Sequence, residues 1–148
     1  MAENNKKLVL EETDYLSSNG IDVWVFGGWA EEINKVIELR LHKDIDLFYF
    51  SNDFELVDRF IRSEHLSEIK GKRFHHKRAF EYKGVVVELF LVEQDSRGSY
   101  TNFWGKKKYY CPSDIKDKID GLNVILPNAL EGYRRDYQQI DNLRKTLQ

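Results

Sequence analysis

Two aspartates, Asp44 and Asp46, lie two residues apart within a largely apolar segment. Alternation along a strand would place both carboxylates on one face, with Ile45 and Leu47 on the other. Adjacent acids repel each other and displace apolar side chains from a sheet, an arrangement that a bound cation would relieve. The pair therefore predicts a metal site, with a solvated strand edge as the simpler explanation of a bare Asp-x-Asp.

A third carboxylate, Glu88, lies inside the apolar segment 85–92. An unpaired carboxylate in such a strand is costly, so it either forms a buried ion pair, with Arg78 or Arg40, or joins the aspartate pair. Three carboxylates from neighbouring strands would form an all-oxygen site suited to Mg²⁺, which completes its shell with water and substrate phosphates. This set predicts phosphoryl or nucleotidyl transfer.

A glycine pair, Gly27-Gly28, separates the strand-like segment 21–26 from the helix-like segment 29–39. Backbone amides at a helix start attract negative charge, and the helix dipole adds to the attraction. Glycine also leaves no Cβ to block the approach of a triphosphate. The pair predicts a phosphate-holding turn, and an ordinary tight turn is the alternative.

The elements that must position these residues alternate between helix and strand. Helices are expected over 6–18, 29–39, 53–63 and 127–147, and strands over 21–26, 40–50, 79–82, 85–92 and 122–126. Residues 95–105 are expected to form a loop and residues 113–119 a short helix. This order predicts an α+β (mixed α/β) fold, with a mixed central sheet of about four to six strands, flanking helices and a C-terminal helix.

Composition limits the class of protein. The 148 residues are expected to form a single domain, 1–148, and 41% of them are hydrophobic. No apolar run is long enough to cross a membrane, and the net charge of −2 argues against a nucleic-acid partner. The polar segment 1–7 does not resemble a secretory signal, and the single cysteine, Cys111, excludes an internal disulfide. A cytoplasmic location is expected.

These motifs together resemble a known family, the antibiotic nucleotidyltransferases. The similarity is to aminoglycoside adenylyltransferases and lincosamide nucleotidyltransferases, within the polymerase-β-like nucleotidyltransferase superfamily. It covers roughly residues 8–92, and residues 93–148 would form the variable acceptor region and the C-terminal helix. The motifs that carry it are Gly27-Gly28-Trp29-Ala30, Arg40-x-His42-x-Asp44-x-Asp46 and the strand carboxylate Glu88.

The resemblance implies a nucleotidyltransferase fold and a Mg²⁺-dependent reaction. A nucleoside monophosphate, AMP from ATP or another NTP, would move to a hydroxyl of a small molecule such as an antibiotic. It also implies a role for each motif residue: Asp44, Asp46 and Glu88 as metal ligands, Glu88 also as the proton acceptor, Gly27 and Gly28 at the triphosphate, and Arg40 and His42 near the phosphates.

Other interpretations differ in what the protein recognises. A nucleotide-binding or antitoxin-like regulatory module would use the basic segment 70–78 and the aromatic residues after 95 as a partner surface. The same aromatic residues, Phe103 and Trp104 among them, could instead line a substrate cleft or pack within the loop. A protein side chain could replace the small molecule as acceptor. A solvated surface is the simpler explanation of segment 70–78, including His75-His76. For a cationic acceptor the candidate acids are Glu31, Asp95 and Glu131, and a homodimer could build the cleft between subunits.

Overall fold

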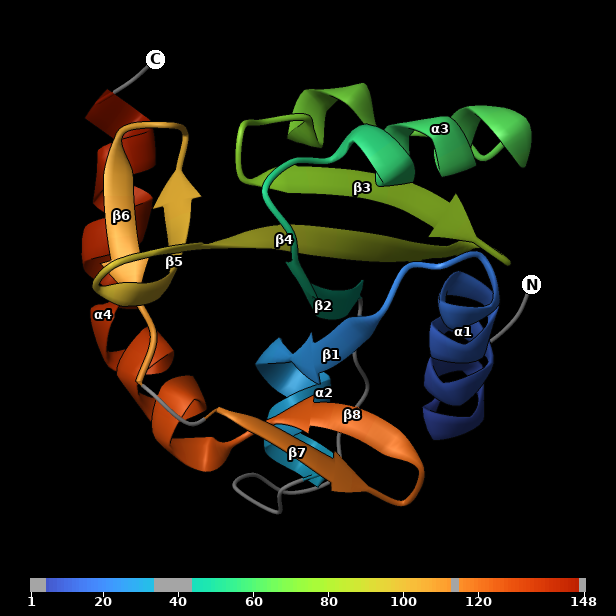
Figure 1. Cartoon of the computed structure of the whole chain (residues 1–148), viewed down its shortest axis with the longest axis horizontal. Coiled ribbons are helices and arrows are strands. Elements are labelled where there is room, and N and C mark those ends of the chain that lie inside the picture. The colour runs from blue at the N-terminus through green and yellow to red at the C-terminus, as the bar shows by residue number, and fades with distance from the viewer. Residues whose placement is uncertain (1–4, 34–43, 113–114, 147–148) are drawn as a thin grey trace.

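The chain forms a mixed β-sheet with helices on both of its faces (Figure 1). A computed structural model describes residues 5–33, 44–112 and 115–146. The helices are α1 (Lys6–Ser18), α2 (Gly27–Ile33), α3 (Glu55–Ser63) and α4 (Pro127–Thr146), with a short 3₁₀ helix, η1 (Lys70–Lys72). The strands are β1 (Val23–Phe26), β2 (Asp44–Phe50), β3 (Lys77–Tyr82), β4 (Val85–Asp95), β5 (Gly98–Phe103), β6 (Lys107–Tyr110), β7 (Lys116–Ile119) and β8 (Leu122–Ile125).

The long strand β4 organises the sheet. The strands follow the order β6-β5-β4-β2-β1-β8-β7, and β3 also pairs with β4. The first part of β4 lies between β2, which is parallel to it, and β3, which is antiparallel. Its last residues pair instead with β5, so the β5–β6 hairpin extends from the end of β4 (Figure 1). One strand thus joins the centre of the sheet to a peripheral hairpin.

The register of three strands determines which side chains share a face. Phe26 of β1 is paired with Asp46 of β2, and Asp46 is paired with Glu88 of β4. Paired residues on neighbouring strands point to the same face. Asp44, two residues before Asp46, therefore lies on that face as well. The pairing alone places the three carboxylates side by side.

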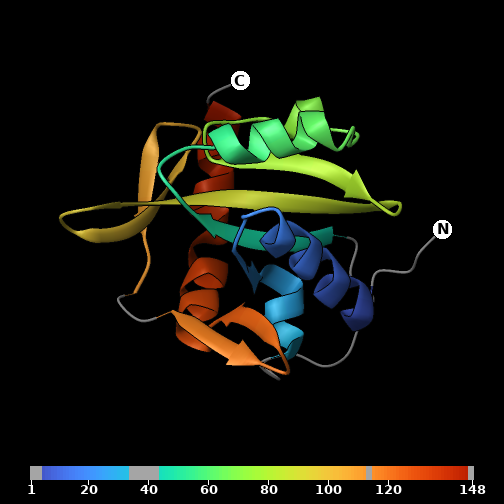
Figure 2. The same cartoon turned by 45° about the vertical axis from the view of Figure 1, so that its right-hand side comes forward.

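The two faces of the sheet are covered by different helices. Figure 2 shows α1 in front of the sheet and α4 behind it. On the face opposite the carboxylates, Tyr15 of α1 and Phe80 of β3 both contact Phe60 of α3, with ring centroids 5.2 and 6.2 Å apart. On the carboxylate face, Phe26 contacts Tyr133 of α4 at 5.7 Å. The polar site therefore lies between the sheet and α4, while the larger apolar core lies beneath α1 and α3.

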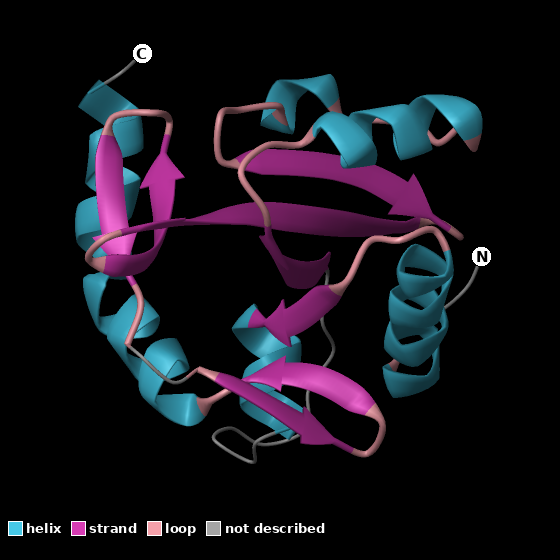
Figure 3. Ribbon diagram, viewed as in Figure 1, coloured by secondary structure: helices cyan, strands magenta, loops and turns pink. Residues whose placement is uncertain are grey.

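The predicted fold class is confirmed, as are the first helix, the last helix and the β3–β4 hairpin. The sheet has eight strands, more than predicted. The loop expected over 95–105 is wrong, because most of it forms β5 (Figure 3). The helix expected over 113–119 is also wrong, because 116–119 form β7, which pairs with β8 through a turn at Asp120-Gly121. No helix in the described ranges is long and apolar enough to span a membrane.

Candidate active site

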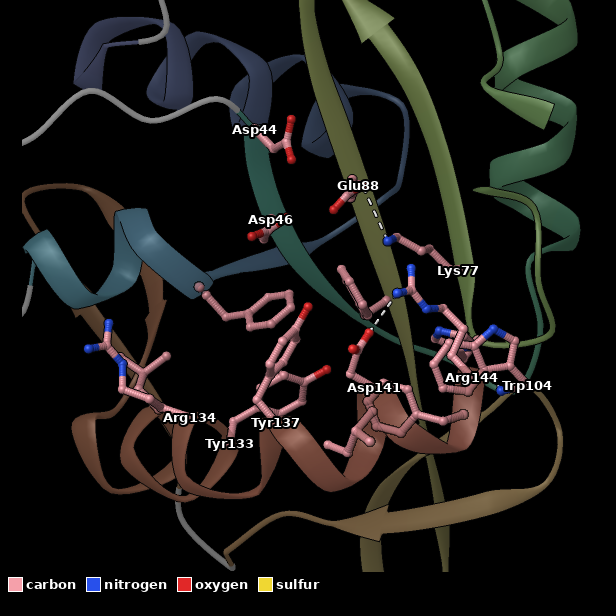
Figure 4. A pocket seen from close by; sticks show the side chains of 17 residues that line it. Asp44, Asp46, Lys77, Glu88, Trp104, Tyr133, Arg134, Tyr137, Asp141 and Arg144 are labelled. Atoms are coloured by element: carbon pink, nitrogen blue, oxygen red, sulfur yellow. Dashed lines mark hydrogen bonds and ion pairs between the residues drawn. The ribbon is translucent and has the colours of Figure 1, made fainter. Parts of the chain in front are cut away.

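Three carboxylates converge at the edge of β2 and the centre of β4 (Figure 4). One oxygen from each of Asp44, Asp46 and Glu88 lies within 4.8 Å of the other two. Glu88 is only 5% exposed, although a carboxylate is rarely buried without a compensating partner. The alternation and register of the two strands produce this convergence without any unusual backbone geometry.

Gly27 allows Asp46 to occupy its position. The φ angle of Gly27 is +68°, in the left-handed region that favours glycine. A Cβ atom at this position would lie 2.5 Å from Oδ2 of Asp46, far closer than non-bonded atoms approach. Any side chain here would displace the carboxylate. The glycine predicted to face a phosphate therefore lies in direct contact with the acidic cluster.

Asp46 is held in surroundings that disfavour its charge. Its Oδ1 atom is buried and has no hydrogen-bond partner among the described residues. Burial raises the pKa of Asp46 well above its usual range, and the hydrogen bond to Glu88 and that group's negative charge raise it further. These effects favour the protonated form of Asp46. A metal ion at this point would satisfy the unpaired oxygen and favour the ionised form.

Two lysines neutralise Glu88. Lys72 forms an ion pair with Oε1 of Glu88, and Nζ of Lys77 lies 3.2 Å from the same oxygen. Burial alone would raise the pKa of Glu88, but the hydrogen bond from Asp46 and the charges of Lys77 and Lys72 outweigh it and lower the pKa. The lowered pKa of Glu88 favours its ionised form, whereas the raised pKa of Asp46 favours its protonated form.

An ion pair between Glu88 and Arg78 was one prediction, and it is wrong. Nε of Arg78 donates to Oδ1 of Asp58 at 2.8 Å, and its guanidinium lies 4.5 Å from the ring centre of Phe54, on α3's side of the sheet. The other predicted partner, Arg40, lies outside the described residues, as does His42. The solvated surface predicted for 70–78 is therefore incorrect for Lys72, Lys77 and Arg78, each of which pairs with an acid.

The donor set fits a divalent cation with a preference for oxygen. Three carboxylates converge on one point, and one of their oxygens lacks a partner within the described residues. The glycine contact also keeps the space beside Asp46 free of side-chain carbon. Mg²⁺ commonly binds through a few carboxylates and completes its octahedral shell with water and phosphate oxygens. The geometry matches that mode of binding.

The carboxylates open into a cavity of about 580 Å³ between the sheet and α4. Gly27, the triad and Lys77 form its inner end, and aromatic side chains form much of its wall (Figure 4). Small-molecule sites typically have this size and a largely apolar lining with a few polar groups. The residues of the wall include Phe26, Phe90, Phe103, Trp104, Tyr133 and Tyr137, together with His76.

Several cavity residues were not identified from the sequence. His76 was predicted to be solvated, but it is 2% exposed, and its Nδ1 accepts a hydrogen bond from the backbone N–H of Trp104 at 2.9 Å. Its neighbour His75 is exposed and lies 3.2 Å from Glu93. The two histidines lie in the turn before β3, with His76 packed inward and His75 at the surface. The four-residue spacing of Tyr133 and Tyr137 predicts one shared face of the last helix, and the structure turns that face toward the cavity.

Two of the three acids proposed for a cationic acceptor, Asp95 and Glu131, do not line this cavity. Asp95 accepts from the Tyr110 hydroxyl at 2.6 Å and pairs with Lys108 at 3.3 Å, within the β4–β6 region. Glu131 lines a separate groove between β6 and α4. The side chain of Glu31 lies outside what the structure describes. Gly28 lies within the first turn of α2.

Comparison with known proteins gives a consistent result. The family described as aminoglycoside-2''-adenylyltransferase matches residues 8–118 of the sequence. The chain belongs to this family. It is therefore an enzyme of the nucleotidyltransferase class, and it belongs with the antibiotic nucleotidyltransferases that the motifs resemble.

Solved structures share the fold. The lincosamide antibiotic adenylyltransferase LnuA, bound to lincomycin, is 14% identical with a TM-score of 0.69, covering 97% of this chain and 98% of its own. ANT(2'')-Ia, in complex with adenylyl-2''-tobramycin, is 12% identical with a TM-score of 0.62, covering 90% of this chain and 78% of its own. At these identities the likeness concerns the fold alone. A search of curated proteins with the present sequence found no match.

Proposed function

We propose that this protein is a Mg²⁺-dependent nucleotidyltransferase that moves AMP from ATP to a hydroxyl group of a small molecule. The observation that carries the proposal is the convergence of Asp44, Asp46 and Glu88 at the inner end of a cavity of about 580 Å³. Family membership supports the reaction class. The cavity is also within the usual size range of small-molecule sites.

The acidic cluster would hold the metal. Asp44 and Asp46 supply ligands from β2, and Glu88 supplies one from β4. When bound, Mg²⁺ would stabilise the negative charge that develops on the phosphate oxygens. The unpaired, buried Oδ1 of Asp46 supports this assignment, because a cation is the partner that such an oxygen lacks.

The proposed transfer needs one proton acceptor. The acceptor hydroxyl oxygen forms a bond to the α-phosphorus of ATP while the bond from that phosphorus to the bridging oxygen breaks, and pyrophosphate leaves. The hydroxyl proton moves to the carboxylate of Glu88, which is ionised at neutral pH because nearby lysines lower its pKa. The side chain of Lys77 is only 17% exposed and contacts Glu88, so its ammonium group would lie near the reacting phosphate.

Four further residues would bind the nucleotide. The amides of Gly27 and Gly28 would bind triphosphate oxygens, and Arg40 and His42 would lie near the phosphates. Gly27 is well placed for this, because it borders the cavity directly beside Asp46. We assign the acceptor to the antibiotics, since the matching family is named for an aminoglycoside and LnuA was solved with a lincosamide.

Transfer is tested with α-labelled ATP, Mg²⁺ and a panel of aminoglycosides and lincosamides. The proposal expects label on one class of small molecule, loss of labelling with EDTA, and a loss of at least about 100-fold in Glu88→Gln and Asp46→Asn. The matched control is Glu81→Gln, an exposed glutamate on the neighbouring strand β3, which should label normally. ATP binding without labelling of any acceptor would favour the regulatory-module interpretation. Label on protein would favour the protein acceptor.

A further inference from the structure

The cavity beyond the carboxylates has few negative charges. Apart from the triad, the described lining contains one acid, Asp141, and three bases, Lys77, Arg134 and Arg144. Asp141 is already paired: its Oδ1 lies 2.9 Å from Arg144, and its Oδ2 lies 3.6 Å from Lys145 on the same helix. Figure 4 shows this pair on α4 facing the cavity. Among the described lining residues beyond the triad, basic side chains therefore outnumber acidic ones.

The same region presents exposed aromatic surface. Tyr137 is 56% exposed and is one of two large apolar side chains that the structure shows at the surface, the other being Leu10 on α1. Tyr137 and the half-buried Trp104 both line the cavity, and they come from different elements, α4 and the β5–β6 turn. Exposed aromatic groups beside a cavity typically mark a binding surface.

Trp104 is held in an unfavourable backbone conformation. Its φ angle is +53°, in the left-handed region that a bulky residue rarely adopts. The backbone N–H of Trp104 donates a hydrogen bond to Nδ1 of His76. The rings of the two residues are also in contact, with their centroids 4.8 Å apart. Burial lowers the pKa of His76 to about 3, and the charges of Lys77 and His75 add to this effect, so the ring remains a neutral acceptor. His76 thus positions Trp104 without adding charge.

We propose that Trp104 and Tyr137 form the acceptor subsite and select a hydroxylated molecule that has an apolar face and at most one positive charge. This inference rests on the proposed function. It departs from the polycationic acceptor class that the family name indicates. His76 is the positioning residue for the Trp104 side of the subsite.

Charge and desolvation give the physical reason. A polycation entering the cavity loses hydration at each of its ammonium groups. An ion pair with a free acid would offset the free-energy cost of that loss. The described lining beyond the triad offers Asp141 alone, and that acid is already occupied by cations. A single cationic or apolar group needs no acid, because the aromatic faces can contact either kind.

The binding test uses the full chain with Mg²⁺ and a non-hydrolysable ATP analogue. Calorimetry compares lincomycin, which has an apolar chain and a single amine, with tobramycin, which is a polycation. The proposal expects lincomycin to bind at least about tenfold more tightly, with a Kd that changes less than about threefold between roughly 50 and 500 mM NaCl. Tighter binding of tobramycin, or a Kd that rises steeply with salt, would overturn it.

Variants separate the subsite from the reaction. Tyr137→Ser should raise the KM for the accepted antibiotic at least about fivefold and leave the KM for ATP unchanged. His76→Gln should do the same through Trp104, and His76→Asn, which keeps an acceptor near the Nδ1 position, should restore part of the loss. Leu10→Ala, at an exposed apolar residue on the other face, is the control. Because Tyr137 is exposed, its variant tests the subsite even if changes at His76 impair folding.

The two proposals fail in different ways. If no antibiotic is labelled but lincomycin still binds and binding is lost in Tyr137→Ser, the reaction assignment is wrong and the subsite stands. If tobramycin is labelled with unchanged KM in Tyr137→Ser and His76→Gln, the subsite is wrong and the reaction assignment stands.

Discussion

Gly27→Ala tests how the acidic cluster is assembled. The new Cβ would lie 2.5 Å from Oδ2 of Asp46, whereas ordinary contact begins at 3.4 Å, so the carboxylate must retreat by about 0.9 Å. Mg²⁺ requires ligand oxygens within about 0.2 Å of their ideal positions. A displacement near 1 Å in a reacting site typically costs about 100-fold in rate. We therefore expect Gly27→Ala to lower nucleotidyl transfer about 100-fold.

The matched control is Gly121→Ala. Gly121 also has a left-handed conformation, with φ of +82°, but a Cβ there meets nothing within 4 Å. Both variants should lose about 1–2 kcal/mol of unfolding free energy, because alanine is strained at positive φ. Only Gly27→Ala should also lose activity and Mg²⁺ affinity.

The assays are urea unfolding, labelled-ATP transfer and metal titration on both variants and the parent. If Gly27→Ala keeps transfer within about threefold of Gly121→Ala, the close approach of glycine to Asp46 is not required, and the proposed metal geometry is wrong. Equal losses of activity in both variants would show that instability, rather than displacement of Asp46, limits the enzyme.

Two further changes probe the electrostatics of the fold. Lys72→Met removes a cation that competes with the metal for Glu88. The apparent Mg²⁺ affinity in a metal titration should therefore rise roughly two- to fivefold, which is the effect expected of a partly exposed ion pair. Weaker Mg²⁺ binding would contradict this competition. Burial and the charge of Glu11 raise the pKa of Glu12 to about 8. The folded state therefore binds the carboxyl proton of Glu12 more tightly than the unfolded chain does. The free energy of unfolding should consequently fall as the pH rises from about 4.5 to 8. Glu12→Gln should therefore be more stable than the parent at pH 8, by on the order of a few kcal/mol, and similar to it near pH 4 in urea unfolding; an equal difference at both pH values would refute the assignment.

The inner end of the site could be predicted from the sequence because strand periodicity determines it. Asp44 and Asp46 share a face through alternation alone, and Glu88 is conspicuous as an acid within an apolar strand. Parallel pairing of two neighbouring strands then brings the three together. The contact of Gly27 with Asp46 could not be predicted, because it depends on the antiparallel register of β1 against β2.

The outer part of the site was harder to predict because its signals are local turns. Trp104-Gly105 and Asp120-Gly121 both adopt left-handed conformations between paired strands, as does Lys83-Gly84, which was recognised. An X-Gly pair between β-prone segments is a hairpin signal, and applying it at all three places would have predicted β5, β6 and β7 as well as β8, which was expected. The burial of His76 has no comparable signal, since it depends on packing against the turn at Trp104.

The division of β4 between two pairings has a consequence for how new specificity can arise. Glu88 lies where β4 is enclosed by β2 and β3, while Glu93 to Asp95 pair only with β5 in the described sheet. The hairpin that carries Trp104 is thus attached at the end of the strand, about 17 Å of extended chain beyond Glu88. Insertions, deletions or recombination in this hairpin would leave the pairing around Glu88 intact. Such a layout lets drift or selection replace the recognition surface for one drug with that for another while the chemistry is inherited unchanged.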